Sequence, residues 1–462
     1  MLGTIIPARR FAIAMVRRML QVDLPTSVRS DEDVEAEVWR NYNWNFSVNV
    51  IDGSLFLLAQ SLMSATTILP FFISRLTDNP FYFGLLAVIA NGGWFFPQLF
   101  SAGPIERTDR KKPWLINLGF FLERMPLVLL TATALLAVSS PSWALALFLL
   151  AFAIYNLGAG IIAPAWQDLL AVCFPATRRG RLMGVTMFVG GITGALGAIG
   201  SSRILETLPF PRNFLILFGL ATILMFLGWA VLALTREPVR RVPRTAENRL
   251  RIWTRLGRIL RRDQNFRRFL IARGMLAVGG MGMAFVTAAA ISKWDVTGGT
   301  VGSYTVALLV GQSASNLLFG LLADRKGHKL ALVLGGLAAS LGYVIAGLAA
   351  VPFLFYLVFI LLGVYFSATF ISGLMIVLEF TGPEQRPTYV GITNSIIGAI
   401  NVVIPLVGSW LATFSYGYLF ALSAVAGLLG VLLMAFWVAD PRHTGADGNG
   451  DRSSERNSDG NA

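Results

Sequence analysis

Long apolar stretches alternate with short charged ones along almost the whole chain. Crossing the roughly 30 Å hydrocarbon core of a bilayer takes about 20 apolar residues as a helix. In lipid every backbone polar group must be satisfied within the protein, so runs of this length are expected to be helices. The pattern predicts an all-α membrane protein with twelve transmembrane helices. Their expected limits are 46–73, 82–104, 114–137, 143–172, 182–204, 212–234, 268–291, 301–322, 329–350, 353–378, 389–412 and 416–438.

The composition supports a membrane protein, since 55% of the residues are hydrophobic and only 14% are charged. A net charge of +13 could indicate a nucleic-acid partner, but most of the 38 lysines and arginines fall on one side of the expected membrane. This positive-inside asymmetry places both termini in the cytoplasm of a multi-pass protein of the cell membrane, and it argues against nucleic-acid binding. The exceptions are Arg75, Arg203, Arg212 and Lys293 on the other side and Arg124 within a span.

The longest internal loop, from Thr235 to Phe269, divides the expected spans into six and six. Leu250, Trp253 and Leu256 recur in it at helical spacing among arginines, which predicts a basic amphipathic helix on the anionic cytoplasmic leaflet, with membrane lipids as partners. The polar C-terminal tail is expected to be disordered. The expected organisation is a cytoplasmic segment (1–44), a six-helix bundle (45–235), a linker (236–266), a second six-helix bundle (267–439) and a tail (440–462).

Charged cytoplasmic loops recur at matching places in the two halves. "SAGPIERTDRKKP" joins spans two and three, and "FGLLADRKGHK" joins spans eight and nine. "PATRRGRLMGV" and "GPEQRPTYVGI" occupy the next matching pair of loops, and aligning Arg179 with Arg386 also brings Gly184 onto Gly391. The repeat predicts two pseudo-symmetric six-helix bundles, a duplicated design that recurs among transporters.

The stretch from Gly320 to Lys329 resembles the loop signature G-x-x-x-D-R-x-G-x-K of the major facilitator superfamily (MFS). The twelve-span layout resembles the same family over about residues 45–438. The resemblance implies secondary transport by alternating access, with this loop acting as a cytoplasmic latch. The first-half copy departs from the pattern, because Arg107 and Arg110 stand in the aspartate and second glycine positions. The Gly-Pro pair of the family's antiporter signature is missing from span five, which argues against drug/proton exchange.

The signature residues have physical roles of their own. Gly320 is expected to let two helix backbones approach closely, and Gly327 to allow a tight turn. Arg325 and Lys329 are expected to hold the loop in the cytoplasm.

In the family, the signature aspartate, here Asp324, faces the opposite half. A carboxylate would gain there from a helix N-terminus and from arginine hydrogen bonds. The matching place in this chain is the start of span five, with Arg178, Arg179 and Arg181. Pseudo-symmetry suggests a second pair, Glu106 with Arg386. The alternative is that Asp324 belongs to a solvated loop that only sets the topology.

Span five contains a G-x-x-x-G pattern at Gly190 and Gly194, which permits close helix contact in lipid. In the family, spans two, five, eight and eleven form the moving seam between the halves. Static packing within one half is the alternative for each of these glycines.

Ionisable groups inside a membrane are costly and are therefore functional candidates. Asp52 lies in span one, and Glu123 and Arg124 lie near the middle of span three. Glu123 should point about 100° away from Arg124 around an α-helix, so an ion pair between Asp52 and Arg124 is the structural interpretation. Proton coupling by Asp52 or Glu123 is the functional one. Asp168 and Glu379, near cytoplasmic ends of spans, are expected to be interfacial or to bond loops.

Uncharged polar groups at mid-depth could line a cavity with amide and aromatic surface but little net charge. Such a cavity suits a neutral or amphipathic organic solute. The candidates are Gln60, Asn91, Tyr155, Asn156, Gln312, Asn316, Asn394 and Asn401.

Enzyme motifs do not fit. The sequence has no G-x-x-x-x-G-K-[ST] phosphate loop, no G-x-S-x-G elbow and no His/Cys cluster for a catalytic metal. We therefore expect no enzyme activity, no cofactor and no metal. The predicted function is proton-coupled secondary transport of a small organic solute by a monomer. The alternatives are an uncoupled facilitator and a non-transporting lipid-handling or sensory protein on the same fold.

Overall fold

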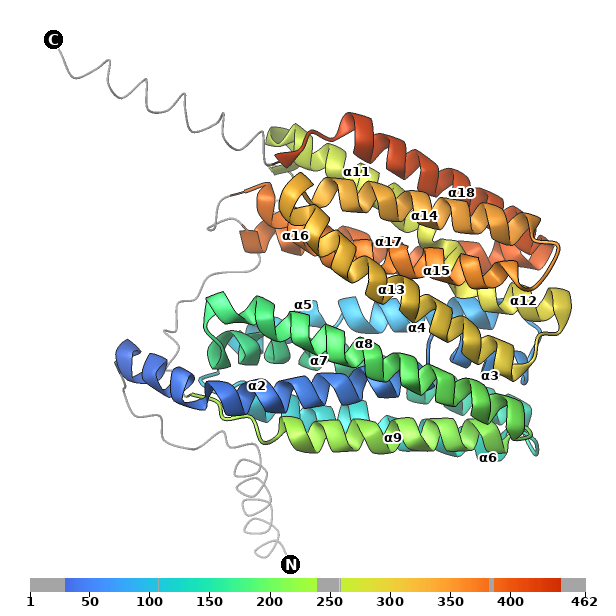
Figure 1. Cartoon of the computed structure of the whole chain (residues 1–462), viewed down its shortest axis with the longest axis horizontal. Coiled ribbons are helices and arrows are strands. Elements are labelled where there is room, and N and C mark those ends of the chain that lie inside the picture. The colour runs from blue at the N-terminus through green and yellow to red at the C-terminus, as the bar shows by residue number, and fades with distance from the viewer. Residues whose placement is uncertain (1–29, 107, 239–256, 258, 382–385, 442–462) are drawn as a thin grey trace, which may run out of the picture. The chain divides into compact units, whose positions relative to one another are not determined.

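The computed structural model describes residues 30–106, 108–238, 257, 259–381 and 386–441, and within these ranges it contains helices and no strand (Figure 1). The amphipathic helix predicted around Leu250–Leu256 lies outside the described residues, as does the tail after Pro441.

The twelve predicted runs correspond to helical segments in the described ranges. In the first half these are α2 (Asp31–Leu62) with α3 (Ile68–Ser74), α4 (Phe81–Phe95) with α5 (Gln98–Glu106), the π-helical turns η1 (Trp114–Leu118) and η2 (Phe120–Arg124) with α6 (Met125–Leu136), α7 (Pro141–Cys173), α8 (Ala176–Thr207) and α9 (Arg212–Leu232).

In the second half, α11 (Gln264–Gly279) continues through the 3₁₀ turn η3 (Gly280–Phe285) into α12 (Val286–Trp294). The remaining segments are α13 (Gly298–Lys326), α14 (His328–Leu348), α15 (Leu354–Ser367) with the π-helical turn η4 (Ala368–Ser372), α16 (Gly373–Met375) and the 3₁₀ turn η5 (Ile376–Glu379), α17 (Arg386–Phe414), and α18 (Tyr416–Leu432) with the π-helical turn η6 (Leu433–Trp437).

Nine of the described helical segments are long and apolar enough to cross a membrane by length and composition alone. The other three predicted runs are also helical, but they are more polar or are interrupted. Helix α2 carries Asn45, Asn49 and Asp52. The second run is broken between α4 and α5 at Pro97, since proline lacks the N–H that would continue the helix.

Helix α2 begins well before the apolar run that it contains. Ser30 caps its N-terminus, with Ser30 Oγ accepting from the backbone N–H of Asp33 at 3.2 Å. Such a cap satisfies one of the helix's free N–H groups and fixes where the helix starts. Part of the segment expected before the first span is therefore a continuation of the same helix.

The two halves repeat the same scheme of helix packing. In the first half α2 packs against α8 and α9, α7 packs against α5 and α6, and α6 packs against α9. In the second half α11 packs against α17 and α18, α15 packs against α13 and α14, and α14 packs against α18. Each pair in one half has its counterpart in the other, so the predicted pair of related helix bundles is confirmed.

A pair of asparagines repeats in the same way. Asn45, on α2, donates to the carbonyl oxygen of Arg236 at 2.9 Å and accepts from its N–H at 2.8 Å. Asn265, on α11, does the same with Ala439, at 2.9 and 2.8 Å. Each asparagine thus ties the first helix of its half to the chain just after the sixth, satisfying backbone groups that no helix satisfies. We call these the asparagine ties.

Contacts between residues group the chain into two compact units. Unit 1 comprises residues 1–63 and 89–246, and unit 2 comprises residues 64–88 and 247–462. Within unit 2 the Thr67 and Thr305 hydroxyls are 2.6 Å apart, and Thr287 Oγ1 donates to the carbonyl oxygen of Thr66 at 2.6 Å. These bonds hold the short segment 64–88 to the helices of the second half.

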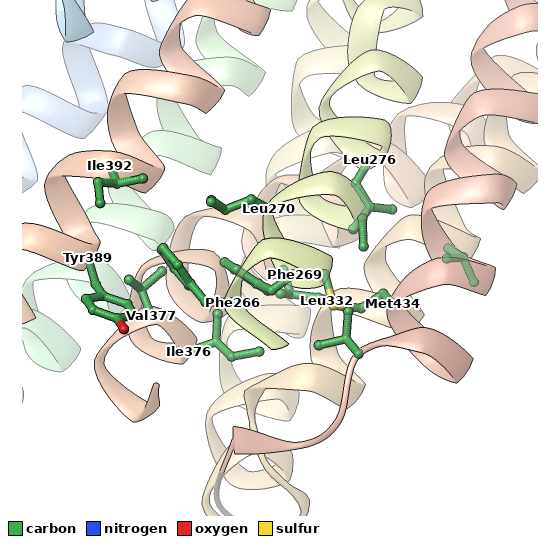
Figure 2. Close-up of a cluster of buried hydrophobic side chains, with 13 residues drawn as sticks. Phe266, Phe269, Leu270, Leu276, Leu332, Ile376, Val377, Tyr389, Ile392 and Met434 are labelled. Atoms are coloured by element: carbon green, nitrogen blue, oxygen red, sulfur yellow. The ribbon is translucent and has the colours of Figure 1, made fainter. Parts of the chain in front are cut away.

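Unit 2 has an apolar core centred on α11, shown in Figure 2. Phe266 contributes its ring to this core and packs on Tyr389 of α17, with ring centroids 4.4 Å apart. We call this group the α11 cluster. Its members are Phe266, Phe269, Leu270, Ala272, Leu276, Leu332, Ile376, Val377, Tyr389, Ile392, Val431, Met434 and Val438.

Glycines set the closest helix approaches within each half. A Cβ on Gly311 of α13 would overlap the carbonyl oxygen of Ile360 on α15 and lie 2.9 Å from the Ile360 Cα. A Cβ on Gly160 of α7 would overlap the carbonyl oxygen of Gly93 on α4. These are the equivalent helix pairs of the two halves, so close backbone packing is itself repeated.

The expectation for Gly320 is wrong within the described part of unit 2. No described atom of unit 2 lies within 4 Å of the position that a Cβ on Gly320 would take. The close approach on α13 is made nine residues earlier, at Gly311. In span five, Gly190 faces Leu57 of α2. This contact lies within one half, as expected if the glycine serves static packing.

Candidate functional site

The three ionisable groups predicted inside the first half come together in unit 1. Asp52 comes from α2, and Glu123 and Arg124 come from η2; they are 9%, 5% and 5% exposed. Arg124 Nη1 forms an ion pair with Glu123 Oε2. The Asp52 carboxylate lies close enough to attract Arg124 without forming an ion pair with it. We call these residues the charged triad.

The direct partner of Arg124 is therefore Glu123, and the predicted ion pair with Asp52 is wrong. The expectation assumed α-helical geometry, in which neighbouring side chains diverge by about 100°. Residues Phe120–Arg124 instead form a π-helical turn, whose wider ring changes the direction of the side chains. The long arginine side chain can then fold back onto its neighbour.

Glycines leave room around the charged triad. A Cβ on Gly119 would lie 3.9 Å from both Arg124 Nη1 and Glu123 Oε2. A Cβ on Gly228 of α9 would lie 3.1 Å from Asp52 Oδ1. Helices α2, η2 and α9 can therefore bring these groups close together within one half.

Two of the cavity candidates join the charged triad. Gln60 Nε2 donates to the Tyr155 hydroxyl at 3.3 Å, and Tyr155 is buried within electrostatic range of Arg124. Asn156 instead donates to Phe152 of its own helix at 2.8 Å. The polar group of the first half thus consists of the triad, Gln60 and Tyr155.

The second-half candidates are not joined to one another by hydrogen bonds in the described residues. Asn316 accepts from Ser367 at 2.6 Å, which bonds α13 to α15. Gln312 and Asn401 are partly buried, and Asn394 is exposed. In the first half Asn91 is partly buried as well.

Arg273, on α11, is a buried charged residue that the sequence analysis overlooked. It is 8% exposed, although the arginine-rich stretch before it favoured a cytoplasmic assignment. The signal that could have found it is its place between Leu270–Ala272 and Gly274–Leu276, inside an expected span.

The loops after spans two and eight each place a basic side chain beside an acid of span four or span ten. Lys111 Nζ lies 3.7 Å from Asp168 Oδ2, and His328 Nε2 lies 4.0 Å from Glu379 Oε1. The loop-bonding interpretation of Asp168 and Glu379 is thus confirmed, and it adds a third repeated feature to the two halves.

Glu237 anchors the first of these loops. Its carboxylate accepts from the backbone N–H groups of Lys111 at 2.6 Å and Lys112 at 3.1 Å. Burial raises the pKa of Glu237, and the two N–H bonds oppose that rise. Burial lowers the pKa of Lys112, and the nearby Glu237 opposes that fall. The anchor fixes the backbone of a loop that departs from the expected signature.

The latch side chains Glu106, Asp324 and Arg386 lie outside what the structure describes. At the start of α8, Arg179 donates to the carbonyl oxygens of Ala171 at 2.6 Å and Phe174 at 3.1 Å. These bonds satisfy the C-terminal end of α7.

The remaining latch candidates take separate positions. The Arg178 guanidinium lies 6.0 Å from the centre of the Trp39 ring. Arg181 and Arg325 are exposed. Lys329 Nζ donates to the carbonyl oxygen of Ala435 at 2.9 Å.

Gly327 meets its expectation as a turn residue. It ends α13 with φ of 85° and ψ of 159°, which is a conformation that favours glycine. Its N–H donates to the carbonyl oxygen of Ala323 at 3.0 Å.

The sequence model of the Major Facilitator Superfamily matches residues 124–293 and 274–457. The chain therefore belongs to this family and is an integral membrane protein. No curated protein matches the sequence significantly.

Solved transporters share the fold at low sequence identity. A POT family transporter in complex with 5-aminolevulinic acid superimposes with a TM-score of 0.64 at 12% identity, over 85% of this chain and 95% of that one. A D-xylose-proton symporter gives 0.64 at 16%, over 87% and 99%. The E. coli fucose:proton symporter gives 0.57 at 15%, over 85% and 98%.

Proposed function

We propose that the chain is a secondary active transporter that moves a small neutral or amphipathic organic solute by alternating access, coupled to protons. Membership of the family supports transport. Similarity to proteins named as proton symporters is consistent with coupling. The observation that carries the coupling is the charged triad, because ionisable groups buried inside a span are costly and are kept for function.

The charge balance of the triad suggests how a proton could act. With Asp52 and Glu123 both ionised, one guanidinium leaves the group with a net charge of minus one. Protonation of one carboxylate makes the group neutral. Burying a net charge in a low-dielectric interior is expensive, so a step that dehydrates the triad favours the protonated form. Proton uptake and conformational change are then linked.

Proton coupling predicts that Asp52→Asn and Glu123→Gln each weaken accumulation driven by a pH gradient. Neutral amides cannot release or take up the coupled proton, but they preserve shape. A solute is first found by thermal-shift screening, and its uptake is then measured in proteoliposomes at two pH values with and without a protonophore. Exchange of solute without a gradient should persist in both variants.

Asp168→Asn is the matched control, because Asp168 bonds a loop outside the triad. It should keep its pH dependence. Unchanged pH dependence in both triad variants would refute coupling by these residues. Uptake that the protonophore does not affect would support an uncoupled facilitator instead.

We also propose the cytoplasmic latch and the orientation that it needs. Both termini would lie in the cytoplasm, and Asp324 would pair with the arginines that begin α8, with Glu106 and Arg386 as a second pair. The observation behind this is the repeated loop sequence together with the signature.

Asp324→Asn is expected to shift the population toward the inward-open form, because it removes one charge of the pair. The readout is thiol labelling of single cysteines placed along α8 and α13 in a Cys173→Ser background, with reagent added from the cytoplasmic side. Cys173 is buried, so replacing it removes the native thiol from the comparison. Labelling rates equal to those of the parent protein would contradict the latch.

A further inference from the structure

The two halves treat their buried arginines differently. In unit 1 Arg124 has Glu123 as its ion-pair partner and Asp52 nearby. In unit 2 no described carboxylate forms an ion pair with Arg273, although Arg273 is 8% exposed. Arginine stays protonated at any physiological pH. Unit 2 therefore holds a buried positive charge that the described protein does not neutralise.

Two acids of the second half, Asp263 and Glu379, have other contacts. Asp263 accepts from the backbone N–H of Phe266 at 2.8 Å and from the Tyr389 hydroxyl at 3.1 Å. Glu379 lies beside His328. These contacts lie at the start of α11 and in η5, and neither acid forms an ion pair with Arg273 in the described residues.

The polar contacts of Arg273 leave donors unused. Nη2 donates to the carbonyl oxygen of Thr369 at 3.4 Å, which is a long bond. The Tyr365 hydroxyl lies beside the guanidinium and donates its own proton to Leu276 at 3.0 Å. Nε is buried with no acceptor. A guanidinium carries five N–H donors, and its Nε lacks the acceptor that burial normally demands.

The backbone is shaped around this side chain. Thr369 lies in η4, a π-helical turn, and such turns occur frequently at functional sites. The next residue after η4 is Gly373, where a Cβ would lie 2.8 Å from Arg273 Nη2 and 3.3 Å from Nε. A larger residue at position 373 would therefore displace the guanidinium. The irregular turn and the glycine together keep space for it.

Apolar residues flank Arg273 along α11. Its neighbours on α11, Leu270, Ala272 and Leu276, belong to the α11 cluster (Figure 2). A charge in such surroundings is expensive unless an opposite charge meets it.

We propose that Arg273 binds the carboxylate of the transported solute, and that the solute is a small amphipathic organic acid. The planar guanidinium edge carrying Nε matches the two oxygens of a carboxylate. Binding would satisfy the free donor and neutralise the charge in one step. This assignment rests on the proposed transport function and narrows its substrate class.

The test uses purified full-length protein and matched pairs of probes. Hexanoate, benzoate and 4-phenylbutyrate are each compared with the corresponding primary amide in a thermal-shift titration. The variants are Arg273→Gln, Arg273→Lys and Arg267→Gln. Arg267 lies on the same helix and is exposed, so it is the matched control.

At least one acid should stabilise the wild-type protein where its amide does not. Its apparent Kd should rise about ten- to hundredfold in Arg273→Gln, because charge-assisted hydrogen bonds contribute about that much to binding affinity. Arg273→Lys keeps the charge but loses the fork, so it should weaken binding less, and it replaces Arg273→Gln if that variant does not fold. Arg267→Gln should bind as the wild type does.

The assignment is overturned if acids and amides stabilise the wild-type protein equally. It is also overturned if both Arg273 variants bind the acid as tightly as the wild type does. A third contrary result is that chloride or inorganic phosphate alone stabilises the protein as the acid does. Uptake of the same acid into proteoliposomes separates this site from the proposed function. If the acid binds at Arg273 but is not taken up, the binding site is supported and the transport proposal is refuted. If a neutral solute is taken up equally by the wild type and by Arg273→Gln, transport is supported and the carboxylate site is refuted.

Discussion

Replacing Arg124 by glutamine is expected to lower the free energy of unfolding by about 3–5 kcal/mol. The guanidinium is the only positive group of the charged triad, and both carboxylates remain buried when it is removed. An uncompensated buried charge costs far more than the ion pair itself contributes. The change is measured as the loss of thermal or denaturant stability in detergent.

The double variant Glu123→Gln/Arg124→Gln separates this effect from simple loss of packing. It removes both charges of the ion pair and leaves only Asp52 without the guanidinium, so it should recover part of the stability that the single variant loses. Arg203→Gln is the exposed control and should change the free energy of unfolding by less than about 0.5 kcal/mol. An Arg124→Gln protein as stable as this control would show that the triad is hydrated in the folded state.

The second large effect is expected from a single methyl group on α13. Gly311→Ala places a Cβ against the backbone of Ile360, where the structure leaves no space. The helices must then move apart or distort, at a cost of about 1–3 kcal/mol or more. The measurement is the melting temperature of the purified variant, together with the yield of monodisperse protein.

Gly320→Ala is the matched control on the same helix. No described atom of unit 2 lies within 4 Å of the added methyl group. Alanine is favoured over glycine inside a helix by about 0.5–1 kcal/mol, so this variant should be neutral or more stable. Equal destabilisation of the two variants would contradict the packing described for α13 and α15.

The fold was predictable from the sequence because one physical constraint dominates it. Backbone groups in lipid must bond within their own segment, so each long apolar run had to be a helix. The charged loops then revealed the duplication, and the shared packing scheme of α2 and α11 confirms it. The asparagine ties were not predicted, because Asn45 and Asn265 have no sequence context that distinguishes a tie to a distant backbone from ordinary polar positions.

The candidate site was predicted less completely, for reasons that lie in local geometry. The three members of the charged triad were found because charge within an apolar run is conspicuous. The partner of Arg124 was wrong because the sequence gives no sign of the π-helical turn that carries it. Arg273 was missed because other arginines precede it, and whether a side chain points into a bundle depends on packing that the sequence alone does not reveal.

In each half, the asparagine tie bonds the first helix to the chain that follows the last helix. Asn45 is bonded to Arg236 in the first half, and Asn265 is bonded to Ala439 in the second. The beginning and the end of each half are therefore held together. No hydrogen bond of either tie involves the stretch 239–256. A break of the chain within that stretch would therefore leave both ties in place, and the protein is expected to tolerate such a cut.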